Sequence, residues 1–262
     1  MQTLFDAHLH AAWARDLPGL ARGCAAAGLR ALAVTTTPGE YLGARGALGP
    51  EATAGAGGLW LAPGLHPWWV ADGRCGEEDV GLACELVAGC RVVGEVGLDH
   101  SPAHVGADGG AAQARAFLAV CRACARTSDA ASPKVLSVHA VRSAGAALDV
   151  LEESGALGAC RCVLHWFSGS SEELVRARRA GCWLSFGERA LATRRGREYA
   201  RSCPLDRLLL ETDAPDAAGA DLAAGDVAAS LRRALREVAR LRGMAEAELA
   251  DALARNARAL LA

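Results

Sequence analysis

The sequence predicts an α/β protein with the architecture of a (β/α)8 TIM barrel. Eight short β-like runs recur along the chain, and helical or loop segments separate them. Strand alternating with helix is typical of parallel βαβ units, and a length of 262 residues fits a closed barrel of eight such units. In addition, histidines and acidic residues follow five of the apolar runs, and the active sites of these barrels lie at the carboxyl ends of the strands.

The expected strands are short apolar segments with turn residues between them. We place them at residues 3–8, 29–35, 59–65, 91–96, 134–139, 161–166, 182–186 and 207–212. Helical periodicity lies between or after them at 18–28, 77–89, 111–127, 143–154, 171–181, 226–242 and 245–261. We expect left-handed caps at the glycines that end several helices, namely Gly28, Gly89, Gly155, Gly181 and Gly243. Residues 100–110 and 214–225 read as loops.

Composition places the chain among ordinary globular proteins. It is 52% hydrophobic and 22% charged, without an internal repeat or a linker, which predicts a single domain over residues 1–262. The N-terminal sequence MQTLFDAHLH has neither a basic start nor a long apolar stretch, so we expect no signal peptide, no membrane association and a cytoplasmic location. A net charge of −2 argues against broad, nonspecific wrapping of nucleic acid and leaves a locally basic cleft open.

The ten cysteines are scattered, which favours reduced thiols over a disulfide framework. Cys121 and Cys124 form a C-x-x-C pair, but the surrounding RAFLAVCRACAR has helical periodicity and no second pair follows. We therefore expect these two residues in the core rather than in a redox or zinc site.

Six polar residues stand at or just after apolar runs. An imidazole or carboxylate at the end of a buried strand is costly unless something binds it, and four imidazoles with two carboxylates form a ligand set for a pair of divalent ions. A single histidine at such a place is more often a structural residue, but six together at equivalent strand ends favour a metal centre. The six are His8, His10, Glu95, His139, His165 and Asp213.

The spacing suggests how two ions would share these ligands. His8 and His10 are two residues apart on an expected strand, so both point to one side and can hold one ion. Glu95 has two carboxylate oxygens and can bridge two ions; His139 and His165 then serve the second ion, and Asp213 completes the first. Such a centre activates water for hydrolysis, with Asp213 as proton acceptor, but it would serve phosphodiesters, lactones or amides equally well.

Seven ordered motifs carry a family resemblance. They are FDAHLH at 5–10, GLHP at 64–67, VGEVGLD at 93–99, SVHAVRSA at 137–144, HWFSGS at 165–170, CWLSFG at 182–187 and DRLLLETDAP at 206–215. Together they resemble the TatD family of metal-dependent deoxyribonucleases, in the amidohydrolase superfamily. VTTTP at 34–38, LSVHAVRSA, the tryptophan of HWFSGS and GCWLSFG further resemble QatD, the TatD-like nuclease of the Qat anti-phage defence systems.

The resemblance implies a barrel hydrolase with two divalent ions (Zn, Mn or Mg) and 3′-to-5′ exonuclease activity. His8, His10, Glu95 and Asp213 would bind the first ion, and Glu95, His139 and His165 the second. DNA, as single strands or 3′ ends, would be the substrate, and other Qat proteins would be partners. His66 in GLHP would lie near the mouth and contact phosphate, although a His-Pro at a strand end also reads as a simple turn.

The remaining substrate contacts are predicted where the chain departs from the family pattern or exposes basic and aromatic residues. The arginine expected two residues after the strand-five histidine is displaced, since Val141 stands there and Arg142 follows. Arg194 and Arg195 lie in what reads as a loop after the seventh strand, at the rim of the site. Trp68 could stack on an unpaired base or pack its own loop.

Two other functions are compatible with the same set of candidate metal ligands. A lactonase or amidase of the same superfamily would need no basic rim. An auxiliary subunit of a defence complex would use the barrel for assembly and have little activity alone, although six polar strand ends argue against a purely structural role.

Overall fold

Eight parallel strands form the centre of the molecule. A computed structural model describes residues 4–262. The strands are β1 (Phe5–Leu9), β2 (Arg30–Val34), β3 (Leu59–Ala62), β4 (Val92–Asp99), β5 (Val135–Val141), β6 (Arg161–Leu164), β7 (Trp183–Phe186) and β8 (Leu208–Leu210). They pair in chain order as two parallel sheets, β1 to β3 and β4 to β8.

Backbone hydrogen bonds between strand residues and the segments that follow neighbouring strands join the two sheets into a barrel. Between β3 and β4, Gly94 N donates to Pro63 O (3.0 Å) and Leu65 N donates to Glu95 O (2.9 Å). Between β8 and β1, Asp213 N donates to His8 O (2.9 Å). The predicted (β/α)8 architecture is therefore confirmed.

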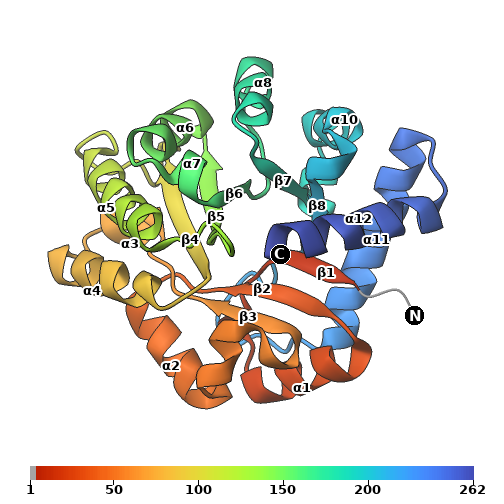
Figure 1. Ribbon diagram of the computed structural model, residues 1–262, viewed down its shortest axis with the longest axis horizontal. Coiled ribbons are helices and arrows are strands. Elements are labelled where there is room, and N and C mark those ends of the chain that lie inside the picture. Colours follow the sequence, from red (N-terminus) through yellow and green to blue (C-terminus); the bar gives the residue numbers. More distant parts are fainter. Residues whose placement is uncertain (1–3) are drawn as a thin grey trace.

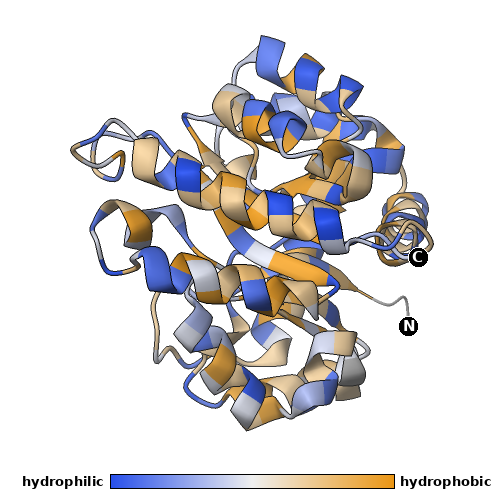
Figure 2. Ribbon diagram, turned by 60° about the vertical axis from the view of Figure 1, so that its left-hand side comes forward, coloured by the Kyte–Doolittle hydropathy of each residue, from blue (hydrophilic) through white to orange (hydrophobic). Residues whose placement is uncertain are grey.

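Helices cover the outside of the barrel (Figure 1). The longer ones are α1 (Leu17–Ala27), α2 (Pro38–Leu48), α4 (Glu77–Ala88), α5 (Ala111–Thr127), α6 (Ala144–Glu153), α8 (Ser171–Arg179), α10 (Arg194–Ser202), α11 (Ala224–Arg242) and α12 (Glu246–Leu261). Shorter pieces are α3 (Pro67–Ala71), α7 (Ala156–Ala159), α9 (Glu188–Leu191), and the 3-10 turns η1 (Ala11–Trp13), η2 (Pro50–Ala54), η3 (Ala56–Gly58) and η4 (Leu205–Arg207). In Figure 2 the strands are largely apolar, whereas the surrounding helices carry many hydrophilic residues.

The strand predictions agree with the structure except at their ends. Position 3 of the first expected strand lies outside the described residues. The fourth strand was predicted to end near Glu95, but it continues to Asp99. Glu95 therefore lies inside β4, where the pairing with β5 is irregular between Val93 and Val96. Among the expected glycine caps, Gly28, Gly155, Gly181 and Gly243 have positive φ, but Gly89 has φ −89° and the prediction for it is wrong.

The last helix closes the amino-terminal end of the barrel. Leu260 on α12 is fully buried and belongs to the same apolar cluster as Val92, Val135 and Trp183, the first residues of β4, β5 and β7. In Figure 1 this helix runs across the strands to the C-terminus. The opposite end, where the strands finish, is left for the polar residues of the site.

The cysteines behave as predicted. All ten are free, and Cys121 and Cys124 are buried in α5. Burial raises the pKa of both thiols. Within the part of the chain that the structure describes, no helix combines the length and the apolar character needed to cross a membrane.

Candidate metal centre

A cavity of about 580 Å3 opens where the strands end. Five of the six predicted ligands line it, and His8 lies beneath it, fully buried. Its wall also contains four tryptophans, from η1, α3 and the segment after β6: Trp13, Trp68, Trp69 and Trp166. The barrel therefore gathers residues that are distant in the sequence into one apolar-walled pocket with a polar floor.

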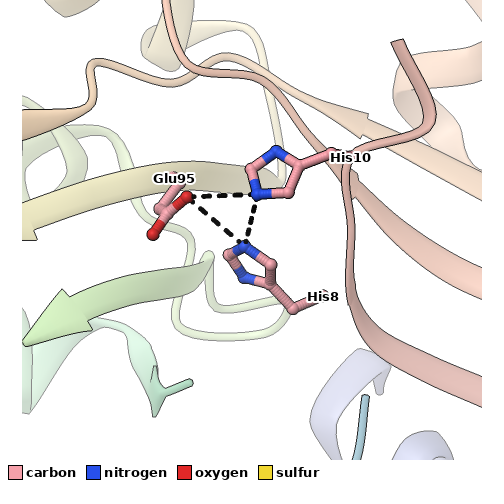
Figure 3. Close-up of side chains that lie close together, drawn as sticks. All are labelled: His8, His10 and Glu95. Atoms are coloured by element: carbon pink, nitrogen blue, oxygen red, sulfur yellow. Dashed lines mark hydrogen bonds and ion pairs between the residues drawn. The ribbon is translucent and has the colours of Figure 1, made fainter. Parts of the chain in front are cut away.

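The first group of ligands forms around one oxygen of Glu95 (Figure 3). Glu95 Oε2 lies 3.4 Å from His8 Nε2 and 3.4 Å from His10 Nε2, and the two nitrogens are 3.3 Å apart. Asp213 Oδ1 lies 3.3 Å from His10 Nε2 and 3.7 Å from His8 Nε2. His8 and His10 therefore lie within reach of both carboxylates, Glu95 and Asp213.

The second group forms around the other oxygen of the same carboxylate. Glu95 Oε1 lies 2.6 Å from His139 Nδ1 and 2.7 Å from His165 Nε2. His66 Nε2 approaches the same oxygen at 3.3 Å. Glu95 is only 2% exposed, so this carboxylate is surrounded by imidazoles on both sides.

A first set of supporting contacts fixes His8 and His139. His8 Nδ1 lies 2.8 Å from Ser137 Oγ on β5, which leaves Nε2 pointing at Glu95. His139 Nε2 lies 3.1 Å from Asp99 Oδ2, and Trp68 Nε1 donates to the same oxygen at 2.6 Å. A partner on the second ring nitrogen sets the tautomer and orientation of a ligand histidine.

Two fully buried carboxylates support the segments that carry the other ligands. Asp6 Oδ1 accepts from His8 N (3.1 Å) and from Thr212 N (3.0 Å), so it ties β1 to the chain beside Asp213. Glu211 accepts from Trp166 N at 2.8 Å and from the Ser185 hydroxyl. Trp166 has φ 38° and Asp213 has φ 53°, left-handed conformations that cost free energy and persist only where surrounding contacts impose them.

The imidazoles and carboxylates shift one another's pKa values. Burial opposes ionisation of Glu95, but the imidazoles of His66, His165 and His8 lower its pKa well below the usual range. Burial opposes protonation of His139 as well, but Glu95 and Asp99 raise its pKa to about 9. Burial and the neighbouring His165 lower the pKa of His8 to about 4. The His139 imidazole is therefore protonated at pH 7, whereas the His8 imidazole is neutral.

Burial has the opposite consequence for the supporting carboxylates. It raises the pKa of Asp6 and that of Glu211 to about 7. For Asp213, burial also opposes ionisation, but the hydrogen bond with His10 and the neighbouring imidazoles of His8 and His165 lower its pKa to about 2. Asp213 is therefore ionised at neutral pH and faces the cavity.

These residues fit divalent cations. Three overlapping sets have ligand atoms close enough for one ion: His8, His10 and Glu95; His8, His165 and Asp213; and His66, Glu95 and His139. Two imidazole nitrogens that face each other at 3.3 Å beside a buried carboxylate are the arrangement that a cation between them would stabilise.

The predicted substrate contacts divide into two sets. His66 and Trp68 line the cavity, but His66 lies against Glu95 rather than out at the mouth, and the indole N–H of Trp68 is bound to Asp99. Arg142, Arg194 and Arg195 are exposed and do not line the cavity. The segment expected as a rim loop is helical, since Arg194 and Arg195 form the first turn of α10.

Sequence reasoning missed several residues of this site. Asp99 and Glu211 lie within the motifs VGEVGLD and LLLETDAP. Asp99 is four residues after Glu95 and Glu211 is two residues before Asp213, and this proximity to candidate ligands was the signal that could have identified them. Trp13, stacked on His10 at 4.4 Å between ring centroids, lies three residues after that histidine in a turn that the sequence pattern does not mark.

Comparison with known proteins agrees with this geometry. The TatD related DNase family profile matches residues 5–262. The mouse (Mus musculus) protein TATDN3, whose name describes it as a candidate deoxyribonuclease, is 28% identical over 166 residues; that match covers 63% of this chain and 53% of TATDN3. The chain thus spans about half the length of this curated relative.

Solved structures show the same fold over nearly the whole chain. The Escherichia coli TatD homologue YJJV superposes with a TM-score of 0.74 at 23% identity, covering 99% of this chain and 98% of that one. A TatD family hydrolase of Entamoeba histolytica gives a TM-score of 0.75 at 14% identity, with the same coverage of 99% and 98%. With the profile match over residues 5–262, these observations show that the chain belongs to the TatD related DNase family.

Proposed function

We propose that this protein is a divalent-metal-dependent deoxyribonuclease. The observation that carries the proposal is the position of Glu95, which places Oε2 beside His8 and His10 and Oε1 beside His139 and His165. A carboxylate with one oxygen in each of two histidine groups is suited to bridge two cations. Five imidazoles favour zinc, manganese or iron over magnesium by ligand softness.

The residues have distinct parts in this proposal. His8, His10, Glu95 and Asp213 would hold one ion, and Glu95, His139 and His165 the other, with His66 near enough to join them. Bound cations would lower the pKa of a water and polarise the phosphoryl oxygen under attack. Asp213, ionised and facing the cavity, would accept the proton released by the attacking water.

Family membership and the shape of the pocket favour DNA as the substrate. The cavity of about 580 Å3 admits a strand end rather than a duplex, and its four tryptophans offer surfaces on which unpaired bases stack. The size of the pocket supports action on single strands or strand ends, and from the motif resemblance we infer 3′-to-5′ exonuclease action on them. From the same resemblance we also infer a role in anti-phage defence with other Qat proteins.

A second candidate is a lactonase or amidase activity. The observation that favours it is the apolar wall of the cavity, in which Arg189 is the one lysine or arginine among the described lining residues. A neutral ester or amide needs no further cations.

The test is cleavage of end-labelled single-stranded DNA by metal-stripped protein after addition of Mg2+, Mn2+ or Zn2+. We expect metal-restored cleavage, shortening from the 3′ end, that is lost in Glu95→Gln. The matched control is Glu198→Gln, an exposed glutamate on α10 outside the cavity. If no metal restores cleavage while a lactone or amide is hydrolysed, the nuclease proposal is wrong. If ligand variants keep a defence phenotype, an auxiliary role replaces it.

A further inference from the structure

One guanidinium faces the polar floor of the cavity. Arg189 Nη1 lies 3.6 Å from Asp213 Oδ2, and Arg189 also forms an ion pair with Asp216. A phosphodiester carries a negative charge, so a cation beside the candidate metal centre is where that charge is best accommodated. The arginines expected from the sequence to do this, Arg142, Arg194 and Arg195, do not line the cavity.

The backbone that carries Arg189 is anchored from behind. Its neighbour Glu188 accepts from Ser230 Oγ at 2.6 Å and from the Arg233 guanidinium at 2.7 and 2.8 Å, and both donors lie on α11. These bonds fix the short helix α9 to the outer layer, while Arg189 lies at the cavity. The fold therefore fixes the backbone position from which the Arg189 side chain extends.

An aromatic ring supports the guanidinium. Arg189 Cζ lies 5.5 Å from the centroid of the Trp166 ring, within the range of a cation–π contact. Trp166 is held in its left-handed conformation by the bond from its N–H to Glu211. The Arg189 guanidinium thus contacts both the Trp166 ring and Asp213 at the edge of the candidate metal centre.

Asp216 supplies the exchangeable partner. Its side chain is 78% exposed, so the ion pair with Arg189 is at the water-facing edge and costs little to open. A guanidinium binds carboxylate and phosphate oxygens with the same fork of N–H donors. We propose that Arg189 is the phosphate-binding residue of this centre, and that Asp216 occupies its guanidinium until a phosphate of the substrate replaces it. This inference rests on the proposed nuclease function.

The test measures binding without cleavage, using a fluorescein-labelled, phosphorothioate-linked single strand and fluorescence anisotropy in Mn2+. We expect Arg189→Ala to weaken binding about tenfold to a hundredfold, the effect of losing a charge-assisted hydrogen bond, and Arg189→Lys to weaken it less. Asp216→Asn should strengthen binding about threefold or more, because the competing carboxylate charge is gone. Arg179→Ala, which removes an exposed charge at the end of α8, is the control and should bind as the wild type does.

Two results would overturn the assignment. If Arg189 only positions Asp213, Arg189→Ala lowers Mn2+ affinity and Asp216→Asn leaves DNA affinity unchanged. If Arg194→Ala or Arg195→Ala causes the same loss as Arg189→Ala, the phosphate lies on α10 instead.

Inorganic phosphate separates this inference from the nuclease proposal. If the wild type neither binds nor cuts DNA, the nuclease proposal fails, and thermal stabilisation by phosphate decides the role of Arg189. Stabilisation of the wild type that is lost in Arg189→Ala supports the role. An equal response from both proteins, or none from the wild type, refutes it.

Discussion

Asp99 contacts neither Glu95 nor the first histidine group, yet it controls a ligand. Its Oδ2 is hydrogen-bonded to both His139 Nε2 and the indole N–H of Trp68. Its Oδ1 accepts a hydrogen bond from Ser101 N at 2.8 Å. These contacts lower the pKa of the carboxyl group, although burial opposes this. The charge on Asp99 in turn helps to orient the His139 ring toward Glu95.

Asp99→Asn should weaken metal binding about tenfold to a hundredfold, the usual cost of losing a partner that orients a ligand histidine. The Asp99 carboxylate uses one oxygen for His139 and Trp68 and the other for Ser101. Asparagine has only one oxygen, so its NH2 group would face one of these N–H donors. Isothermal titration with Mn2+ or Zn2+ measures the change. Asp206→Asn, an exposed carboxyl on η4, is the control, and equal affinities for both variants would contradict the orienting role.

Asp6 shows a different use of a buried acid. It accepts three hydrogen bonds, from His8 N, Thr212 N and Thr212 Oγ1, at the junction of β1 and the segment after β8. Because burial raises its pKa to about 7, the ionised and neutral forms coexist at that pH, and in both forms its oxygens can accept hydrogen bonds from these donors.

Asp6→Ala should therefore lower the free energy of unfolding by about 1–3 kcal/mol, since it leaves buried donors without acceptors. Asp6→Asn keeps an acceptor oxygen and should cost clearly less. Urea unfolding at pH 7 measures both variants. Equal losses for the two would show that charge, not hydrogen bonding, is what the site needs.

Helix α12 has a structural task that is separate from the chemistry. It covers the amino-terminal end of the barrel with Leu260, and Asn256 donates to the carbonyls of Leu205 (2.6 Å) and Leu208 (2.7 Å), which bind it to the start of β8. The site lies at the opposite end. Stability and metal binding should therefore respond separately to changes in this helix.

Leu260→Ala should lower the free energy of unfolding by about 2–5 kcal/mol through the cavity it leaves. Mn2+ affinity should stay as in the wild type, because no ligand touches this helix. Arg258→Ala, an exposed change on the same helix, should alter neither quantity. A loss of metal affinity in Leu260→Ala would show that the two ends of the barrel are coupled.

The stability of the whole molecule depends on pH through the histidines of the candidate metal centre. The pKa of His139 is raised from 6.5 to about 9, and that of His165 is also raised, chiefly by Glu95 against the effect of burial. A group whose pKa is raised on folding stabilises the protein below its unfolded pKa and loses that contribution as the pH rises through its folded value. The lowered pKa of His8, about 4, makes the stability fall only as the pH drops below 6.5. It therefore does not offset the loss of stability that His139 causes above pH 6.5.

Metal-stripped protein should therefore lose stability between pH 6.5 and pH 9, by an amount on the order of 3 kcal/mol for His139. Cations that replace the protons should remove most of this decline, and their apparent affinity should rise with pH over the same range. Urea midpoints at several pH values, with and without Mn2+, measure both effects. A flat profile for the stripped protein would contradict the raised pKa of His139.

The fold was largely predictable, because it follows from local patterns. Apolar runs separated by turn residues located all eight strands, but α2 was missed because its sequence PGEYLGARGAL contains three glycines and forms a helix through packing of Tyr41 and Ala44. The end of β4 was also wrong. Strand pairing with β5 continues past Glu95, and Gly97 permits it, since a Cβ there would come within 2.0 Å of His139 O.

The convergence of the six candidate ligands was predictable and their surroundings were less so, while their binding of metal stays a prediction. Five of the strands and the segments that follow them bring six residues together at one end of the barrel, although Glu95 lies inside β4 and not at its end: His8, His10, Glu95, His139, His165 and Asp213. The arginine that faces the cavity could not be chosen from the sequence, since Arg189 and Arg194 both follow β7 and only the turn of α9 separates them in space. The single-domain organisation of residues 1–262 stays a prediction.

The shared carboxylate of Glu95 has a consequence for how the centre fills. Because one side chain serves both histidine groups, a ligand bound on Oε2 alters the charge and orientation that Oε1 presents. Thermodynamic linkage makes this influence reciprocal: whatever factor the first ion applies to the affinity of the second, the second applies to the first. Loading should thus follow a cooperative isotherm, positive or negative, rather than the sum of two independent ones, and half-filled protein becomes a distinct species with its own population.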